Sequence, residues 1–195
     1  MSEINTIDIL GDDIAVRKLI DKSIEGPFVD DTINSIGAYV FIGCSLLSSA
    51  SFPKVKTMGA YAFSGCINLA AVSLPALETI GDYSFNNCPL LTTVSFPVAS
   101  YIGLGMFNSC SHLVSASFMA ATIVGDRAFY NCPNLTTVIL GNTAKAATLN
   151  NARAFTNADN AIIYVPDELV DSYKAATNWS TYADRIKGIS ELPEE

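Results

Sequence analysis

Residues 80–97 read IGDYSFNNCPLLTTVSFP, and this stretch decides the fold because the chain repeats it. Its cysteine, Cys88, belongs to a set of five cysteines, each 22 residues from the next. Glycine, phenylalanine and leucine recur at the same interval. The four columns are Gly37, Gly59, Gly81, Gly103 and Gly125; Phe41, Phe63, Phe85, Phe107 and Phe129; Cys44, Cys66, Cys88, Cys110 and Cys132; and Leu47, Leu69, Leu91, Leu113 and Leu135. Four columns in register over five units indicate a repeat protein.

Each unit contains the signals of one coil of a solenoid. In LLTTVSF (residues 90–96), apolar and hydroxyl-bearing side chains are interleaved, which predicts a short strand with one buried face. Pro97 cannot donate to a strand ladder, so it is expected to end the strand. SYIG (residues 100–103) predicts a second short extended piece, and LGMFNSC (residues 104–110) predicts a helical or irregular turn.

Stacking allows these coils to share one core, with neighbouring strands about 4.8 Å apart. The phenylalanine and cysteine columns are expected to lie in that core. Five regular repeats occupy residues 36–143, and residues 1–35 are expected to form an N-terminal cap made of a short helix and half a coil. Residues 144–166 predict a degenerate terminal coil, in which Phe155 joins the phenylalanine column after a four-residue insertion. Residues 167–195 predict a helical C-terminal cap.

The repeated pattern I/V/M-G-x-x-x-F-x-x-C-x-x-L-x-x-V/A-x-F/L-P resembles that of the BspA-like leucine-rich repeats, although Met119 and Gly141 replace the proline in the last two units. The resemblance implies a leucine-rich-repeat solenoid with short parallel strands, irregular or short helical turns, and helical end caps. It also implies a non-enzymatic bacterial protein, displayed on the cell surface or secreted. Such a protein mediates protein–protein or cell-adhesion contacts, for example with a host matrix or cell-surface protein.

The cysteines do not predict a disulfide framework or a metal site. An odd number leaves at least one thiol unpaired, and stacking would hold their Cβ atoms about 4.8 Å apart, beyond the usual disulfide range of about 3.5–4.5 Å. Zinc needs four converging ligands, and the single histidine, His112, stands at a position that varies between units. We therefore expect buried free thiols and no cofactor. No cluster of residues in the repeats predicts catalysis.

The net charge of −8 is concentrated near the two ends of the chain. Residues 36–143 carry three basic and three acidic residues, so they offer no basic stripe for nucleic acid. No run of about eighteen apolar residues predicts a membrane-spanning helix. The first 26 residues show no secretory signal, which leaves the localisation undecided. A monomer is expected.

The outward positions of the strands form two columns of small side chains, most of which carry hydroxyl groups. One column is Ser49, Ala71, Thr93, Ser115 and Thr137, and the other is Ser51, Ser73, Ser95, Ser117 and Ile139. Two interpretations remain open: small polar residues that suit a solvated parallel sheet, or an uncharged face that contacts a protein or a glycan. The columns lack the aromatic and arginine anchors typical of a binding hot spot.

A structural role is the alternative to a binding role. In that interpretation, the chain is an assembly component of a surface or phage-like complex. Its acidic N-terminal segment would then dock onto another component.

Overall fold

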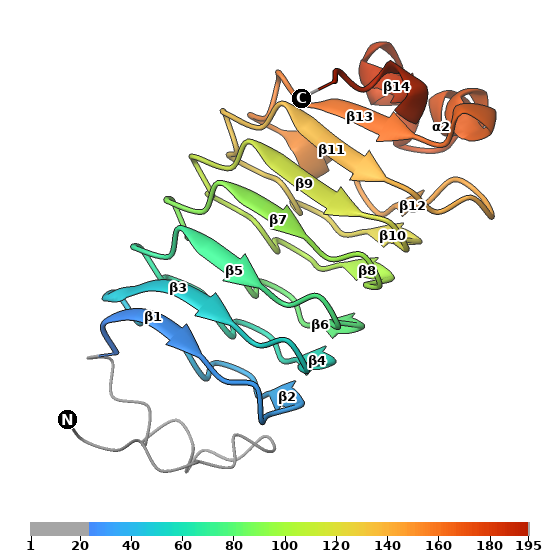
Figure 1. Ribbon diagram of the computed structural model, residues 1–195. Coiled ribbons are helices and arrows are strands. Elements are labelled where there is room, and N and C mark those ends of the chain that lie inside the picture. Colours follow the sequence, from blue (N-terminus) through green and yellow to red (C-terminus); the bar gives the residue numbers. More distant parts are fainter. Residues whose placement is uncertain (1–23, 195) are drawn as a thin grey trace.

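Two short strands and a turn make up each coil of the stack, which the computed structural model describes for residues 24–194 (Figure 1). The longer strands lie on one side: β1 (Gly26–Val29), β3 (Leu47–Ser51), β5 (Ala71–Ser73), β7 (Thr93–Ser95), β9 (Ser115–Phe118), β11 (Thr137–Leu140) and β13 (Ile162–Val165). Two-residue strands lie on a second side: β2 (Ser35–Ile36), β4 (Thr57–Met58), β6 (Thr79–Ile80), β8 (Tyr101–Ile102), β10 (Ile123–Val124) and β12 (Thr148–Leu149). The predicted leucine-rich-repeat solenoid is confirmed.

All strand pairs are parallel, and within the regular repeats their register follows the 22-residue period. Ser49 pairs with Ala71, and Ser51 pairs with Ser73, so equivalent residues of successive coils lie side by side. The glycine column permits this close stacking. A Cβ atom on Gly81 would overlap the backbone of Ala60 in the preceding coil, so no larger residue fits there without moving the backbone.

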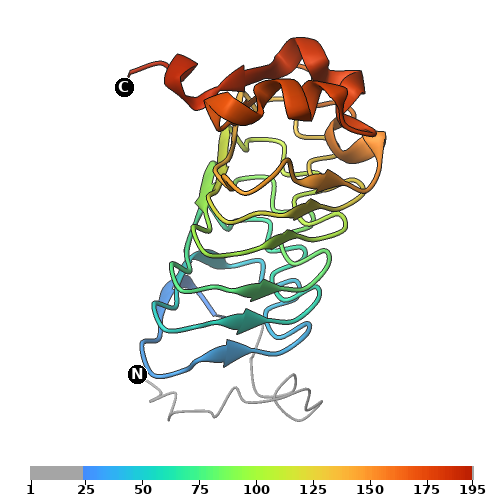
Figure 2. The same ribbon diagram turned by 90° about the vertical axis from the view of Figure 1, so that its right-hand side faces the viewer.

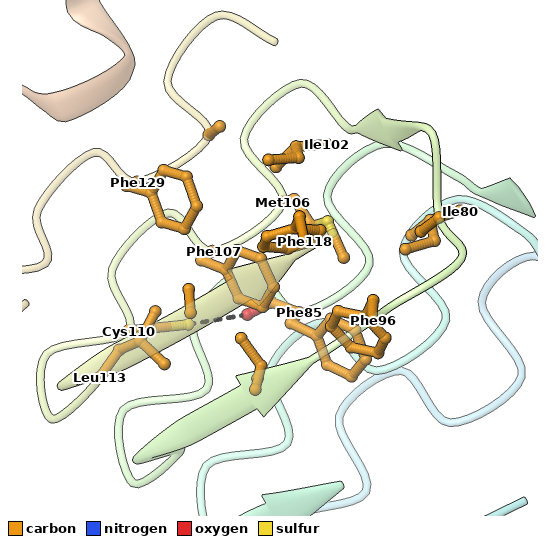
Figure 3. Close-up of a cluster of buried hydrophobic side chains, with 14 of the residues drawn as sticks. Ile80, Phe85, Phe96, Ile102, Met106, Phe107, Cys110, Leu113, Phe118 and Phe129 are labelled. Carbon is orange, nitrogen blue, oxygen red and sulfur yellow. Dashed lines mark hydrogen bonds between the residues drawn. The ribbon is translucent and has the colours of Figure 1, made fainter. Parts of the chain in front are cut away.

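The phenylalanine column forms the centre of the core (Figure 3). Its rings are fully buried and stack nearly parallel, with centroids 4.8 Å apart for Phe41 and Phe63 and 5.7 Å apart for Phe85 and Phe107. Phe155 stacks on Phe129 at 5.2 Å, which confirms the alignment across the four-residue insertion. A continuous aromatic stack therefore joins the regular repeats to the degenerate last coil.

The cysteines of the column are buried and form no disulfide bonds with one another, as expected. The Cys66 thiol donates to the carbonyl oxygen of Phe41 at 3.0 Å, and Cys110 makes the equivalent bond to Phe85 at 3.1 Å (Figure 3). Burial raises the pKa of the Cys66 and Cys132 thiols to about 12. These thiols pack as small hydrophobic groups that also satisfy a backbone carbonyl.

Burial of these thiols predicts slow labelling and a loss of stability at alkaline pH. At pH 8, the native protein should react with a thiol reagent at least about 100-fold more slowly than the protein in denaturant. Because folding raises the pKa of Cys66 from 9.0 to about 12, its stabilising contribution is complete below pH 9 and is lost as pH rises toward 12. Labelling kinetics and denaturant unfolding between pH 7 and about pH 11 measure both effects.

An added surface thiol provides the control for labelling. In the Ser95→Cys variant, one exposed thiol should react at once while the other five remain slow. Rapid labelling of all five natural thiols in the native protein would refute their burial.

The N-terminal end contains more of a coil than the expected half, because β1 pairs with β3. Sequence reasoning missed this strand, since Gly26 and Pro27 do not follow the repeat pattern. Phe28 pairs with Ala50 in register, and its ring lies 5.7 Å from Phe41. A large side chain in the first strand thus fills the end of the core. The N-terminal helix expected within residues 1–23 lies outside the described residues.

The C-terminal cap covers the last coil (Figure 2). After the short helix η1 (Ala152–Phe155), which belongs to that coil, the cap contains η2 (Asp167–Leu169), α2 (Val170–Ala175), η3 (Trp179–Arg185), β14 (Ile186–Gly188) and η4 (Ile189–Glu191). The expectation of a purely helical cap was wrong in one respect, because β14 pairs with β13 and extends the sheet.

Side chains of the cap replace the hydrogen bonds that a further coil would make. Asn178 Nδ2 donates to the carbonyl oxygen of Leu149 at 2.7 Å, and Trp179 Nε1 donates to that of Ala147 at 2.7 Å. In the preceding coil, the carbonyl groups of Val124 and Thr122 accept from backbone N–H groups of the next coil. The cap therefore supplies hydrogen-bond donors to the carbonyl groups at the open edge of β12, and the stack ends there.

Candidate functional site

The two predicted columns of small residues form what we call the strand face, the outward side of β3, β5, β7, β9 and β11. Pairing in register places the members of each column side by side from β3 to β5 and from β7 through β9 to β11. Ala71, Ser73, Thr93 and Ser95 are exposed, whereas the columns are half-buried toward both ends of the solenoid. The most accessible part of the strand face thus lies on β5 and β7.

A depression of about 560 Å³ lies at this accessible part. It brings together five of the predicted residues, and it does not include Ser49, Ser51, Ala71 or Thr137. Its lining carries hydroxyl groups, prolines and aliphatic side chains, with no charged or aromatic residue. The lining residues are Val72, Ser73, Leu74, Pro75, Thr93, Val94, Ser95, Pro97, Ser115 and Ser117.

Exposed apolar side chains border the strand face where the chain enters the strands. Leu46, Ile67, Leu90 and Val114 belong to four successive coils and are 39–45% exposed. We call these four residues the apolar rim. Sequence reasoning missed the rim because its members occupy three different positions of the repeat, so no single column reveals it.

A ladder of tyrosines is the second feature that sequence reasoning missed. Tyr39, Tyr61 and Tyr83 stack nearly parallel, with ring centroids 5.1 and 4.9 Å apart. All three have positive φ angles, which are uncommon for residues other than glycine. The ladder ends at Gly105, where a Cβ atom would overlap the ring of Tyr83. Their 22-residue spacing was visible in the sequence and could have identified them.

The described residues contain no cluster of side chains suited to metal binding. His112 is exposed, and its Nδ1 lies 2.7 Å from the carbonyl oxygen of Pro89 in the preceding coil. Among residues 24–194, no group of three or more histidine, cysteine, aspartate or glutamate residues could hold a metal ion. In the same range, no helix has both the length and the apolar character needed to cross a membrane.

Comparison with known families identifies the repeats. Residues 29–169 match the family described as "BspA type Leucine rich repeat region", in six copies. The chain belongs to the BspA-type leucine-rich-repeat family. A comparison of this BspA-type chain with curated proteins finds no match.

Solved structures of bacterial leucine-rich-repeat proteins share this BspA-type fold. The T. pallidum leucine-rich-repeat protein TpLRR is 28% identical, with a TM-score of 0.63 over 74% of this chain and 70% of that chain. A protein from Eubacterium ventriosum is 23% identical, with a TM-score of 0.59 over 69% of this chain. The pneumococcal vaccine antigen PcpA is 16% identical, with a TM-score of 0.63 over 84% of this chain. The matches cover 37% of the Eubacterium chain and 40% of PcpA, so this chain spans less than half of either protein.

Proposed function

We propose that this BspA-type chain is a non-enzymatic binding module, which contacts a protein partner through the strand face and the apolar rim. The observation that carries the proposal is the depression across β5, β7 and β9, which five of the predicted residues line. Repeat solenoids commonly bind partners along an extended surface of this kind. We further propose that it makes protein–protein or cell-adhesion contacts at a bacterial surface, with a host matrix or cell-surface protein as the partner, which the resemblance of its repeats to BspA-like proteins implies.

The apolar rim favours a protein over a glycan as the partner. Leu46, Ile67, Leu90 and Val114 present aliphatic side chains beside a neutral face, and such surfaces suit apolar contacts at the core of a protein interface. Glycan sites usually offer an aromatic platform, and the lining of the depression contains none. Because the lining is also uncharged, binding there should depend only weakly on salt concentration.

The test begins with capture of partners from bacterial cell-surface and host matrix proteins. The affinity of an identified partner is then measured for a variant that carries Thr93→Arg, Ser95→Arg and Ser115→Arg. Three bulky charges would block the depression, and we expect affinity to fall at least about tenfold. Unchanged affinity would exclude the strand face as the binding site.

A matched control places three arginines on the second side of the solenoid, which is formed by the two-residue strands. Thr57, Thr79 and Thr148 lie on β4, β6 and β12 and are exposed. Their replacement by arginine should change affinity by less than about twofold, because surface substitutions away from a binding site have small effects. An equal loss in both variants would show that added charge, rather than position, weakens binding.

A further inference from the structure

The strand ladders are interrupted at one boundary between coils. On the first side, β1, β3 and β5 form one sheet, and β7, β9, β11, β13 and β14 form another. On the second side, β2, β4 and β6 form one sheet, and β8, β10 and β12 form another. Both interruptions fall between the same two coils, the coil of β5 and β6 and the coil of β7 and β8 (Figure 1).

Backbone hydrogen bonds that recur at other boundaries are missing here. Val114 N donates to Thr92 O at 2.8 Å, and Gly125 N donates to Ile102 O at 2.8 Å. One coil earlier, within the described part of the chain, Thr92 N makes no such bond to Ala70. Three further bonds of this kind are missing among the described residues: those from Leu74 N to Ser95 O, from Ser100 N to Glu78 O, and from Gly103 N to Ile80 O. The bond from Thr93 N to Ala70 O, whose equivalents join Ser115 to Thr92 and Thr137 to Val114, is missing as well.

The turn side of the same boundary remains fully bonded. Tyr83 N donates to Leu104 O at 2.8 Å, and Phe85 N donates to Met106 O at 3.0 Å. A third bond joins Asn87 N to Asn108 O at 2.8 Å. Backbone hydrogen bonds therefore join the two coils on the turn side, whereas the equivalent bonds on the two strand sides are missing.

Backbone spacing gives an independent sign of this opening. A Cβ atom added to Gly125 would lie 2.7 Å from the backbone of the preceding coil, and at Gly59 and Gly81 it would overlap that backbone more strongly. At Gly103 the nearest atom would be 3.1 Å away. The coils are thus farther apart at Gly103 than at the equivalent glycines.

Two side chains at this boundary account for the wider spacing on the second strand side. Tyr101 replaces the threonine found at Thr57 and Thr79, and its hydroxyl group donates to Asp82 Oδ1 at 2.9 Å. The same carboxylate oxygen accepts from Leu104 N at 2.9 Å. This bridge between coils takes the place of the missing bond at Gly103.

A comparison within the chain separates the roles of these two residues. Asp126 stands at the position equivalent to Asp82, yet its boundary keeps the ladder bond from Asn150 N to Val124 O. The next coil at that boundary has Thr148 in place of a tyrosine. The aspartate alone therefore does not open the ladder. The two carboxylates differ in their partners, because Asp82 Oδ1 accepts from the Tyr101 hydroxyl group whereas Asp126 Oδ2 accepts from Arg153 Nη2 at 2.7 Å.

We propose that the boundary between these coils is a hinge, at which the solenoid opens on its strand sides while the turn side stays bonded. The N-terminal block, residues 24–88, and the C-terminal block, residues 93–194, would move about the bonded turn side. The depression lies across the hinge, because Ser73 comes from one block and Thr93 from the other. A partner that contacts both blocks would shift the hinge toward the state it binds more tightly.

Amide hydrogen exchange in the free protein tests the hinge without any partner. Gly103 and Gly125 are equivalent and equally buried, but only Gly125 makes the ladder bond. We expect the Gly103 amide to exchange at least about 100-fold faster than that of Gly125, and the Phe85 amide to be as slow as that of Phe107. Equal exchange at Gly103 and Gly125 would overturn the proposal.

A variant that carries the residues of the preceding coil tests whether the Asp82–Tyr101 bridge causes the opening at Gly103. Asp82→Ala with Tyr101→Thr reproduces Ala60 and Thr79 at the hinge. Exchange at Gly103 should slow at least about tenfold, with no change at Phe107, because the ladder bond to Ile80 can then form. Unchanged exchange at Gly103 in the folded variant would overturn the role of the Asp82–Tyr101 bridge. If the variant does not fold, the comparison in the natural protein still decides the proposal.

Discussion

Replacing Phe107 with alanine is expected to lower the free energy of unfolding by about 3–5 kcal/mol. The Phe107 ring is fully buried and stacks between Phe85 and Phe129, with ring centroids 5.7 and 5.5 Å away. Alanine would leave a cavity in the middle of the stack, and the coils on either side cannot close it without breaking their own hydrogen bonds. Denaturant unfolding measures the loss as a shift in midpoint.

Two further variants separate cavity formation from general sensitivity to substitution. In Phe107→Leu, the leucine side chain fills most of the space of the ring, so the free energy of unfolding should fall by less than in Phe107→Ala. Val98→Ala removes an aliphatic side chain that is 47% exposed and should change stability by less than about 0.5 kcal/mol. A loss at Phe107 no greater than that at Val98 would contradict the stacked core.

Replacing Trp179 with alanine is expected to have a similarly large effect, about 3–5 kcal/mol, at the C-terminal end. The Trp179 side chain is fully buried, and its ring centroid lies 6.0 Å from Phe155 and 5.2 Å from Tyr173. Its loss would open the cap and leave the carbonyl group of Ala147 without its donor. Because each coil is stabilised mainly by its neighbours, fraying should begin at the last coil.

Trp179→Phe is the matched variant, because it keeps an aromatic ring while it removes the indole N–H and part of the ring volume. It should lower the free energy of unfolding by less than Trp179→Ala does, and the difference reports the packing contribution of the ring that is kept. Hydrogen exchange should show faster opening of β12 and β13 in Trp179→Ala, with β3 unchanged. If hydrogen exchange became equally faster along the whole chain, the cap would not act by closing the C-terminal end of the stack.

The sequence was sufficient to predict the stack of coils and the composition of its core. A residue that faces the core in one coil faces it in the next, so the spacing of Phe85, Cys88 and Leu91 determined the burial of three whole columns. Even the degenerate coil could be aligned, because Phe155 preserved the aromatic position after the insertion. Wherever the repeat is maintained, the environment of a residue in one coil predicts the environment of the equivalent residue in the next.

Features outside the period could not be predicted in the same way. Strands β1 and β14 have no repeat signature, and they form because the edges of β3 and β13 offer backbone groups for pairing. The hinge depends on the combination of Asp82 and Tyr101 in adjacent coils, which appears in sequence as two unremarkable substitutions. Such features arise from contacts between coils, and a column-by-column comparison does not reveal them.

The candidate site was only partly visible in sequence. The alternation of residues in the strands identified Ser73, Thr93 and Ser95 as outward-facing, and the structure places them in one depression. The sequence did not distinguish these residues from Ser49 or Thr137 in the same columns. The structure makes that distinction, because the exposed members of the columns lie on β5 and β7, on either side of the interruption between the two sheets.

The most direct test of the proposed binding function is to map where an identified protein partner contacts the solenoid. Amide chemical shifts of the labelled chain, recorded while the partner is added, give this map residue by residue. We expect the largest changes at residues 72–75 and 93–97, with further changes at Leu90 in the apolar rim. Changes confined to the tyrosine ladder at Tyr39 and Tyr61, with none on the strand face, would contradict this expectation.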